Sequence, residues 1–186
     1  PRLDQCRIPP LNQYRAIAGM AVAMAAKDNR RATVTHCVFC DIVDGKLPAI
    51  KVHEDDHVIA IMDIFPLRRA HVLVIPKQHH RQLHELDSNL RSHLVDTASR
   101  ITQAMYASSL APAAVHYNVN DGPAAHQTVP HVHLHILPRY KGDSRSFLLR
   151  LLRKPLDLLV GPANAAGLEK DAAEIRRHLT VTHSAP

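Results

Sequence analysis

Three histidines alternate with apolar residues in one stretch of this sequence, which reads PHVHLHILP over residues 130–138. Side chains two positions apart in a β-strand share a face, so His131, His133 and His135 should line one face at steps of about 7 Å. The apolar residues between them should face the core. We expect the imidazoles to lie on an exposed half of the strand, where they would do chemistry instead of packing. A metal site, a phosphate clamp, or a nucleophile with its helpers would each explain them.

Imidazole suits chemistry at phosphorus. Its neutral form dominates at neutral pH and is a good nucleophile, while a neighbouring imidazolium can bind a phosphate oxygen or protonate a leaving group. One histidine that attacks and another that donates a proton would together transfer a phosphoryl or nucleotidyl group through a covalent phosphohistidine. This scheme requires no catalytic metal.

Cys37 and Cys40 form a CxxC motif ahead of the first predicted strand. Two thiolates need two further ligands to close a tetrahedral zinc site, and structural zinc is the first interpretation of the motif. A redox dithiol and two buried free thiols are the alternatives. Three cysteines in 186 residues do not make a disulfide framework, so we expect reduced thiols and a cytoplasmic protein.

The chain is basic, with 23 Lys and Arg against 17 Asp and Glu and a net charge of +6. This balance favours an anionic partner. The basic residues are dispersed, and four Tyr, three Phe and no Trp are too few for a stacking platform, which argues against nucleic acid. No apolar run approaches the roughly 20 residues of a membrane span, so we expect no membrane partner. A small phosphorylated ligand fits the mild positive charge.

The apolar pattern predicts a mixture of strands and helices. We expect a short helical turn over residues 37–43, a hairpin over 48–54 and 57–63, and further strands over 71–76, 114–120 and 131–137. A long helix should run from Asp87 or Ser88 to about residue 110. The loop over residues 121–128 is rich in turn residues and small polar groups, which makes it a candidate ligand contact.

Composition divides the chain into three parts. Residues 1–36 read as a leader, disordered or helical, with an alanine-rich stretch that resembles a weak signal peptide. Residues 37–143 carry the motifs and should form the functional domain. Residues 144–186 read as a C-terminal extension, in which 147–152 is apolar and 168–179 has the pattern of an amphipathic surface helix.

The alternating histidines resemble the signature of the histidine triad (HIT) superfamily of nucleotide hydrolases and transferases. Further segments resemble landmarks of that family in the same order: FCDIV from Phe39, EDD from Glu54, MDI from Met62, HVLVIPK from His71 and NDG from Asn120. The resemblance covers residues 37–143. It implies an α+β fold with an antiparallel sheet of about five strands flanked by helices. It also implies a homodimer, with the long helix and the strand around His116 as the interface.

The resemblance assigns roles to individual residues. His133 would be the nucleophile, His135 would contact the phosphate or bridging oxygen and help the leaving group, and His131 would support the site. Asn120 would bind phosphate. The remaining implied substrate contacts are Gln127 and Thr128 at the phosphate, Asp63 at the ribose hydroxyls and Ile64 in the nucleoside pocket.

The resemblance also implies ligands for the CxxC motif. In zinc-carrying bacterial members, the other two ligands are the first triad histidine and a histidine that follows a Pro-Lys segment. The matching residues here are His131 and His79, although the adjacent His80 could replace His79. Such a zinc would tie the N-terminal turn to the catalytic strand and stabilise the fold instead of activating water.

Two branches of the family share features with this chain. The phosphate loop and the residues after the triad are similar to the Fhit branch, which cleaves dinucleoside polyphosphates. The CxxC motif is more like the Hint-like bacterial branch, which hydrolyses nucleoside phosphoramidates. The chain lacks the tryptophan typical of Hint proteins and the HPHPQ pattern of the uridylyltransferases.

We therefore expect a purine nucleotide hydrolase or transferase with an AMP-like ligand. A dinucleoside polyphosphate phosphorylase and a nucleotide-binding scaffold with little turnover are the alternatives.

Overall fold

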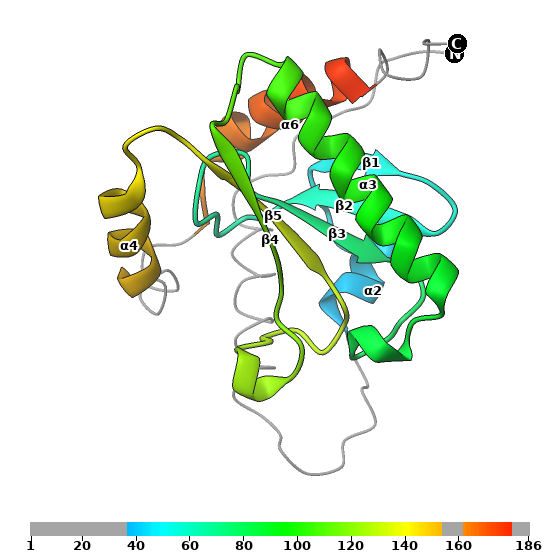
Figure 1. Cartoon of the computed structure of the whole chain (residues 1–186). Coiled ribbons are helices and arrows are strands. Elements are labelled where there is room, and N and C mark those ends of the chain that lie inside the picture. The colour runs from blue at the N-terminus through cyan, green and yellow to red at the C-terminus, as the bar shows by residue number, and fades with distance from the viewer. Residues whose placement is uncertain (1–36, 154–161, 180–186) are drawn as a thin grey trace.

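A five-stranded antiparallel sheet forms the centre of the protein (Figure 1). The computed structural model describes residues 37–153 and 162–179, so the predicted leader over 1–36 lies outside the described residues. The strands are β1 (Lys51–Glu54), β2 (Val58–Met62), β3 (Val72–Pro76), β4 (Ala114–Val119) and β5 (Leu134–Arg139). Their order is β1-β2-β3-β5-β4, and every neighbouring pair is antiparallel. The predicted α+β fold with about five strands is confirmed.

The strands differ in how deeply they are buried. β2 and β3 have the sequences VIAIM and VLVIP, and every residue of both is buried, as expected of strands that are covered on both faces. β4 is an edge strand whose residues are mostly exposed. The predicted strands agree with the structure to within one residue except at β1 and β5. β1 begins at Lys51 and not at residue 48, and β5 runs from Leu134 to Arg139 and not over residues 131–137.

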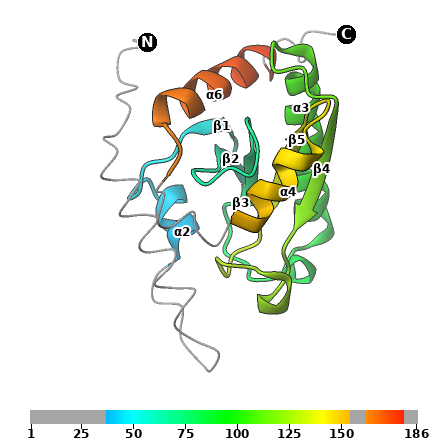
Figure 2. The same ribbon diagram turned by 90° about the vertical axis from the view of Figure 1, so that its left-hand side faces the viewer.

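Two helices lie on opposite sides of the sheet (Figures 1 and 2). α3 (Ser88–Ala107) begins at the predicted N-cap, where the Asp87 side chain accepts a hydrogen bond from the Leu90 amide at 2.9 Å. Its buried face packs on β3 and β5. The short α2 (Val38–Val43) carries the CxxC motif at its beginning. Single 3₁₀ turns at Leu83–Glu85 and Pro123–Ala125 shape the loops that follow β3 and β4.

The C-terminal helix α6 (Ala165–Leu179) belongs to the same hydrophobic core as the sheet. It packs against α3 and β1. Its largest buried apolar residues are Leu168, Ile175 and Leu179. The Arg69 guanidinium, ahead of β3, donates to the Asp171 carboxylate of α6 at distances of 2.7–3.1 Å. The amphipathic helix predicted over 168–179 is therefore present, and it forms part of the core.

The remaining helix, α4 (Ser144–Arg153), stands at the margin of the molecule (Figures 1 and 2). It follows β5 and lies beside the exposed edge formed by β4, where the rings of Phe147 and His116 are 6.2 Å apart. Among the described helices, none is long and apolar enough to cross a membrane.

Candidate functional site

Two of the three triad histidines are buried. His131 exposes none of its surface and His133 exposes 4%, whereas His135 is half-buried. The expectation of three imidazoles on an exposed half-strand is therefore wrong. The physical reason lies ahead of β5, where the Val132 amide donates to the carbonyl of His80 at 2.7 Å. This bond ties the first part of the triad into the interior, between the sheet and the segment that follows β3.

The hydrogen bonds of His133 determine which of its ring nitrogens can react. Its Nδ1 lies 2.7 Å from the His131 carbonyl oxygen, and since a carbonyl can only accept, Nδ1 carries the proton. Nε2 therefore keeps its lone pair. Burial lowers the pKa of His133 from its usual value, which favours the neutral ring at pH 7. Phe39 packs edge-on against this ring, with centroids 5.1 Å apart.

A chain of side-chain hydrogen bonds runs from His135 into the protein. Nδ1 of His135 lies 2.9 Å from Nε2 of His71, and Nδ1 of His71 lies 3.0 Å from a carboxylate oxygen of Asp63. His71 is 1% exposed and comes directly before β3, and Asp63 comes directly after β2. The ring centroids of His133 and His135 are 4.9 Å apart, so the chain ends beside His133.

Asp63 determines where protons sit along this chain. The Leu67 amide nitrogen also lies 3.3 Å from Nδ1 of His71, but the carboxylate is closer, so Nδ1 carries a proton and donates it to Asp63. Nε2 of His71 and Nδ1 of His135 then share one proton. When the pair holds one additional proton, the Asp63 carboxylate stabilises the positive charge, and Nε2 of His135 becomes a proton donor.

The role of His71 is not apparent from the sequence motifs, where it appears only at the start of an apolar run. The signal that could have revealed the role of His71 is its place in the sequence, directly before the apolar run of β3. A polar residue that enters a strand as apolar as β3 becomes buried, and a buried imidazole needs hydrogen-bond partners. Its partners come from the neighbouring strands, β2 and β5.

Asn120 lies at the start of the predicted phosphate loop, directly after β4. Its Oδ1 accepts a hydrogen bond from the Asn118 side chain at 2.6 Å, and its Nδ2 donates to the His126 carbonyl at 3.4 Å. His126 has a φ of 62°, a left-handed conformation that is costly for a residue with a Cβ. These contacts fold the loop back on itself.

The Gln127 side chain holds the same loop together. Its carbonyl oxygen accepts from the Gly122 amide at 2.9 Å, and its amide donates to the Arg81 carbonyl at 2.8 Å. The φ of Gly122 is 98°, which requires glycine. The structure thus gives Gln127 partners within the protein backbone, and leaves the neighbouring Thr128 exposed.

Asp63 and Ile64, the predicted nucleoside contacts, lie side by side after β2. The second oxygen of Asp63 accepts from the Phe65 amide at 2.8 Å. Ile64 is half-buried, and its carbonyl accepts from the Ala163 amide at 2.8 Å, which joins this segment to the chain just before α6.

Four metal-ligand atoms converge between α2 and the triad. Cys37, Cys40, His79 and His131 each offer one, and all four lie within 4.8 Å of one another. Cys40 Sγ lies 3.2 Å from His79 Nδ1, and Cys37 Sγ lies 3.4 Å from His131 Nδ1. These spacings suit a tetrahedron around an ion with zinc's bond lengths of about 2.0–2.3 Å. The structure brings His79 into this group, and not His80.

The other ring nitrogen of His131 supports the same interpretation. Its Nε2 donates to the Pro76 carbonyl at 2.8 Å, which leaves the lone pair on Nδ1 facing the thiols. Burial lowers the pKa of His131 to about 4, so the ring is neutral. Burial and the neighbouring Cys37 raise the pKa of Cys40 to about 12, so the thiols would release protons on binding a cation. Two sulfurs and two nitrogens fit a structural zinc, because four protein ligands leave no open position.

Comparison of the sequence with known proteins gives consistent matches over this region. The HIT domain family matches residues 44–142. An uncharacterized HIT-like protein of Mycobacterium tuberculosis is 46% identical over 110 residues, which cover 59% of this chain and 76% of that protein. An adenosine 5'-monophosphoramidase of Schizosaccharomyces pombe is 38% identical over 105 residues, which cover 55% of this chain and 74% of that enzyme.

Solved structures match the same region, and one of them extends over a larger part of the chain. A zinc-bound histidine triad family protein from Mycobacterium smegmatis has a TM-score of 0.66 and 34% identity, over 81% of this chain and 97% of that protein. A HIT family hydrolase from Clostridium thermocellum has a TM-score of 0.51 and 36% identity, over 59% of this chain and 96% of the hydrolase.

Proposed function

Since this chain belongs to the HIT domain family, we propose that it is a nucleotide hydrolase or transferase acting on the α-phosphate of adenine or other purine nucleotides. One observation carries the proposal, which is the state of His133. This buried imidazole is tied through Nδ1 to a backbone carbonyl and keeps its lone pair on Nε2. Beside it, His135 supplies a proton donor that is linked to a carboxylate. Together they form a nucleophile and a general acid at one site.

In the first step, Nε2 of His133 attacks the α-phosphorus, and the bond from phosphorus to the leaving group breaks. The leaving amine or nucleotide takes the proton from Nε2 of His135, which returns the His71–His135 pair to its neutral state. The product is a nucleotidyl-His133 intermediate. Asp63 favours this step because its negative charge stabilises the protonated pair.

In the second step, water or another acceptor attacks the same phosphorus, and the phosphorus–nitrogen bond breaks. The proton of the acceptor passes to Nε2 of His135, and His133 regains its lone pair. The site is then ready for another cycle, with AMP or a transferred nucleotide as product.

We place the phosphate at the loop over residues 120–128. Asn120 and Thr128 are the proposed polar contacts, and Gln127 acts mainly by holding the loop in shape. On the nucleoside side, the Asp63 carboxylate retains acceptor capacity for the ribose hydroxyls beside its bond to His71, and Ile64 supplies apolar contact. His131 supports the site through the carbonyl that fixes His133.

An adenosine phosphoramidate is the substrate that we favour, and a dinucleoside polyphosphate is the alternative. The relative named adenosine 5'-monophosphoramidase supports the first choice. The CxxC motif and its two histidines are consistent with it.

We further propose that Cys37, Cys40, His79 and His131 hold a structural zinc ion. The donor set and the zinc-bound relative from Mycobacterium smegmatis support this assignment. A bound zinc ion would cross-link α2 to the triad segment. Because the thiols must be reduced, we propose a cytoplasmic location.

A homodimer through α3 and β4 completes the proposal. Val95 and Tyr106 on α3 and Tyr117 on β4 expose 48–56% of their surface, and β4 is a sheet edge. Exposed apolar side chains beside an unpaired edge favour association with a second copy.

The experiment is AMP release by the full chain from an adenosine phosphoramidate and from a diadenosine polyphosphate, with His133→Ala beside the wild type. We expect release from the phosphoramidate, and a loss of at least about a thousandfold in His133→Ala, since the covalent route is then closed. His84→Ala, which removes an exposed histidine outside the site, is the matched control and should keep the wild-type rate.

Each outcome has a distinct meaning. Retained turnover in His133→Ala would refute the nucleophile assignment. Release from the dinucleotide alone would place the chain with the polyphosphate-cleaving branch. AMP binding without release from either compound would favour a nucleotide-binding protein with little turnover.

A further inference from the structure

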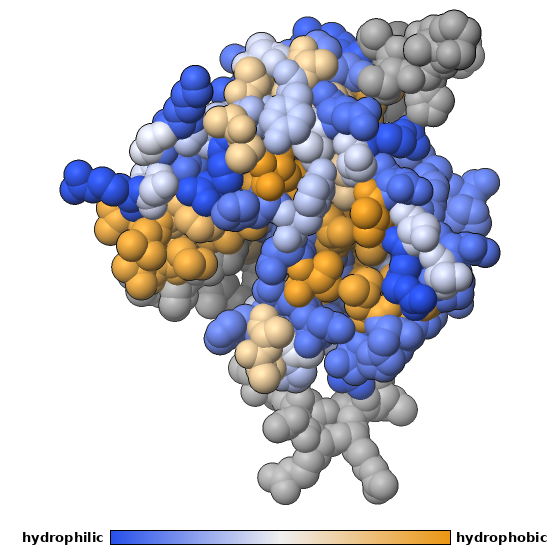
Figure 3. All heavy atoms as spheres, viewed as in Figure 1, coloured by the Kyte–Doolittle hydropathy of each residue, from blue (hydrophilic) through white to orange (hydrophobic). Residues whose placement is uncertain are grey.

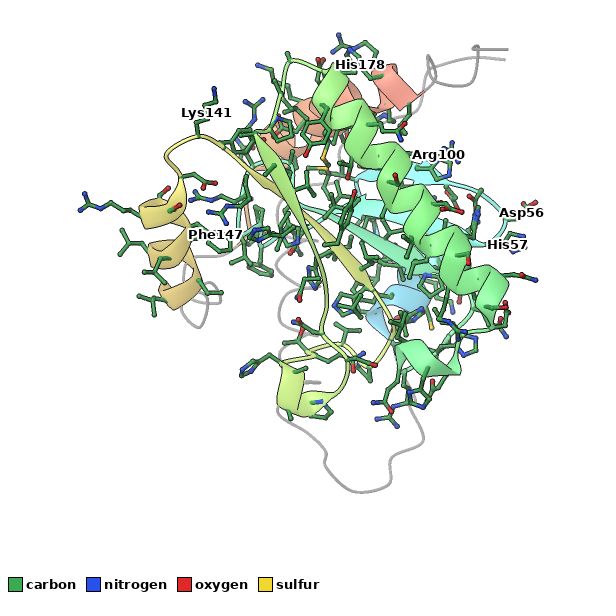
Figure 4. The ribbon with its side chains drawn as sticks, in the orientation of Figure 1. Asp56, His57, Arg100, Lys141, Phe147 and His178 are labelled. Carbon is green, nitrogen blue, oxygen red and sulfur yellow. The ribbon has the colours of Figure 1, made fainter. Side chains whose placement is uncertain are left out.

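Helix α4 is attached to the protein by its polar side. Ser146 accepts a hydrogen bond from the Arg68 guanidinium at 2.7 Å, and the Arg150 side chain donates to the Pro66 carbonyl at 3.3 Å. Between them, Phe147 points from the helix toward the strands (Figure 4). There it lies under the guanidinium of Arg139, 4.1 Å from the ring centroid.

The opposite side of α4 is apolar and faces solvent. Four leucines of one short helix expose 47–68% of their surface: Leu148, Leu149, Leu151 and Leu152. At 3.6 residues per turn they share one arc, opposite the arc of Ser146, Phe147 and Arg150. In the space-filling view they form an apolar patch at the left margin of the molecule (Figure 3). This arrangement is the reverse of that of an ordinary surface helix, whose apolar face is buried.

The charge of α4 indicates what covers the leucines. Its sequence, SRSFLLRLLR, contains three arginines and no acidic residue, and the exposed Lys141 lies just before it (Figure 4). Asp143, also just before it, is already paired with Arg68 and Arg139. The partner of this surface must therefore bind leucine side chains and carry negative charge.

We propose that α4 docks on the surface of an anionic lipid bilayer. A short helix that exposes leucines on one side, contains no acidic residue and carries Arg145 and the preceding Lys141 is typical of segments that lie in the membrane interface. The proposal replaces the expectation from sequence that no membrane partner exists, and it does not require that α4 span the bilayer. The cytoplasmic leaflet is anionic, and would attract the arginines as the leucines enter the headgroup region.

Two other occupants fit the observations less well. A groove on another protein encloses a helix on several sides, whereas α4 offers only its outward arc, because the other arc is bonded to the body. Pairing of α4 with α4 of a second copy would bring together two basic helices that contain no acidic residue. A plane of anionic headgroups has neither difficulty.

The experiment is co-sedimentation of the full chain with vesicles of phosphatidylcholine, with and without phosphatidylserine. We expect binding only to the vesicles that contain phosphatidylserine, with weaker binding at high salt. Leu149→Gln/Leu152→Gln should weaken this partition by about tenfold or more, since it removes apolar area without changing charge. Arg145→Gln should weaken it less, and in a salt-dependent way.

Ala166→Gln is the control, because Ala166 is an exposed apolar residue on α6, outside both α4 and the proposed dimer interface. It should leave vesicle binding unchanged. Circular dichroism and phosphoramidate turnover of the leucine variant should remain those of the wild type, which separates a docking defect from misfolding.

Three results would overturn the proposal. The first is a failure of the wild type to bind anionic vesicles, and the second is unchanged binding by the leucine variant. The third is a lower molar mass of that variant in light scattering, which would show that a second copy of the chain covers α4.

Discussion

At the scale of single residues, Asp63 contributes to the proposed chemistry through His71. The two side chains and His135 lie on three different segments, yet they form one hydrogen-bonded chain that ends beside His133. The carboxylate stabilises the positive charge that the two imidazoles carry when they hold an additional proton. In the proposed mechanism, that protonated pair is what lets His135 act as the general acid.

Asp63→Asn tests this contribution. The amide has the same shape but no charge, so we expect kcat for phosphoramidate hydrolysis to fall by about a hundredfold. For substrates whose leaving group needs no proton, kcat should fall less in this variant, because only protonation of the leaving group is impaired. Steady-state kinetics with an amine and a phenolate leaving group would measure this difference.

Asp56→Asn is the control, because Asp56 is an exposed carboxylate in the turn between β1 and β2. An equal loss with both leaving groups would contradict a proton-relay role for Asp63. It would then favour a role in holding the ribose.

At the scale of elements, the CxxC helix and the triad segment touch through the four candidate zinc ligands. α2 has six residues, and no side chain caps its beginning, so it depends on packing, and the proposed metal site would hold it further. A zinc ion here would contribute stability directly, because an ordered site does not exist in the unfolded chain.

Cys37→Ser should therefore lower zinc content below one ion per chain and lower the melting temperature. Chelation of the wild type should produce the same melting temperature as the variant, because both lack the same cross-link. His80→Ala is the control, because His80 is adjacent to His79 but outside the group of four ligands, and it should keep zinc content unchanged. Elemental analysis and thermal denaturation measure both quantities, and full zinc content in Cys37→Ser would contradict the ligand assignment.

The attachment of α4 depends on a charged cluster. Hydrogen bonds from Arg139, together with the Tyr140 amide, lower the pKa of Asp143 from 3.8 to about 2. A carboxyl with a lowered pKa contributes stability above its unfolded pKa and loses it as pH falls through the folded value. The contribution is thus complete above about pH 4 and declines toward pH 2.

Asp143→Asn should lower stability at pH 7 and flatten the pH dependence of stability between pH 4 and 2. Urea denaturation at a series of pH values measures this, with Asp44→Asn, an exposed carboxyl after α2, as the control. Parallel acid profiles for Asp143→Asn and the wild type would show that this cluster does not contribute.

At the scale of the whole molecule, the extension after the triad joins the same core as the sheet. α6 packs on α3 and β1, and its Asp171 holds Arg69 near the start of β3. The chain before α6 also bonds to Ile64, the residue next to Asp63. The C-terminal helix therefore supports the segment that carries the proposed nucleoside contacts.

Ile175→Ala tests this integration. Ile175 is fully buried in the core, so its truncation should lower the free energy of unfolding by about 2–4 kcal/mol. Lys170→Ala, at an exposed position of α6, should change it by no more than about 0.5 kcal/mol. Urea denaturation followed by circular dichroism measures both free energies of unfolding. Equal stability of Ile175→Ala and the wild type would show that α6 folds apart from the sheet.

Residue pattern was sufficient to predict the α+β class and most of the elements. The apolar runs of β2 and β3, the proline that ends β3 and the Asp87 cap act over a few residues, so β2, β3 and α3 are readable without tertiary information. The order of the motifs along the chain was also sufficient to predict the triad and the CxxC motif as centres of chemistry, because residue type and spacing alone restrict what they can do.

The burial of His131 and His133, the choice of His79 over His80, and the link from His135 through His71 to Asp63 could be seen only in three dimensions. Most of these features depend on contacts between residues that are far apart in the chain, such as Cys40 with His79, 39 residues apart, and Cys37 with His131, 94 residues apart. The outward direction of the α4 leucines was decided in the same way. The helix period groups the leucines on one face, but only the packing of Phe147 against Arg139 determines which face meets the solvent.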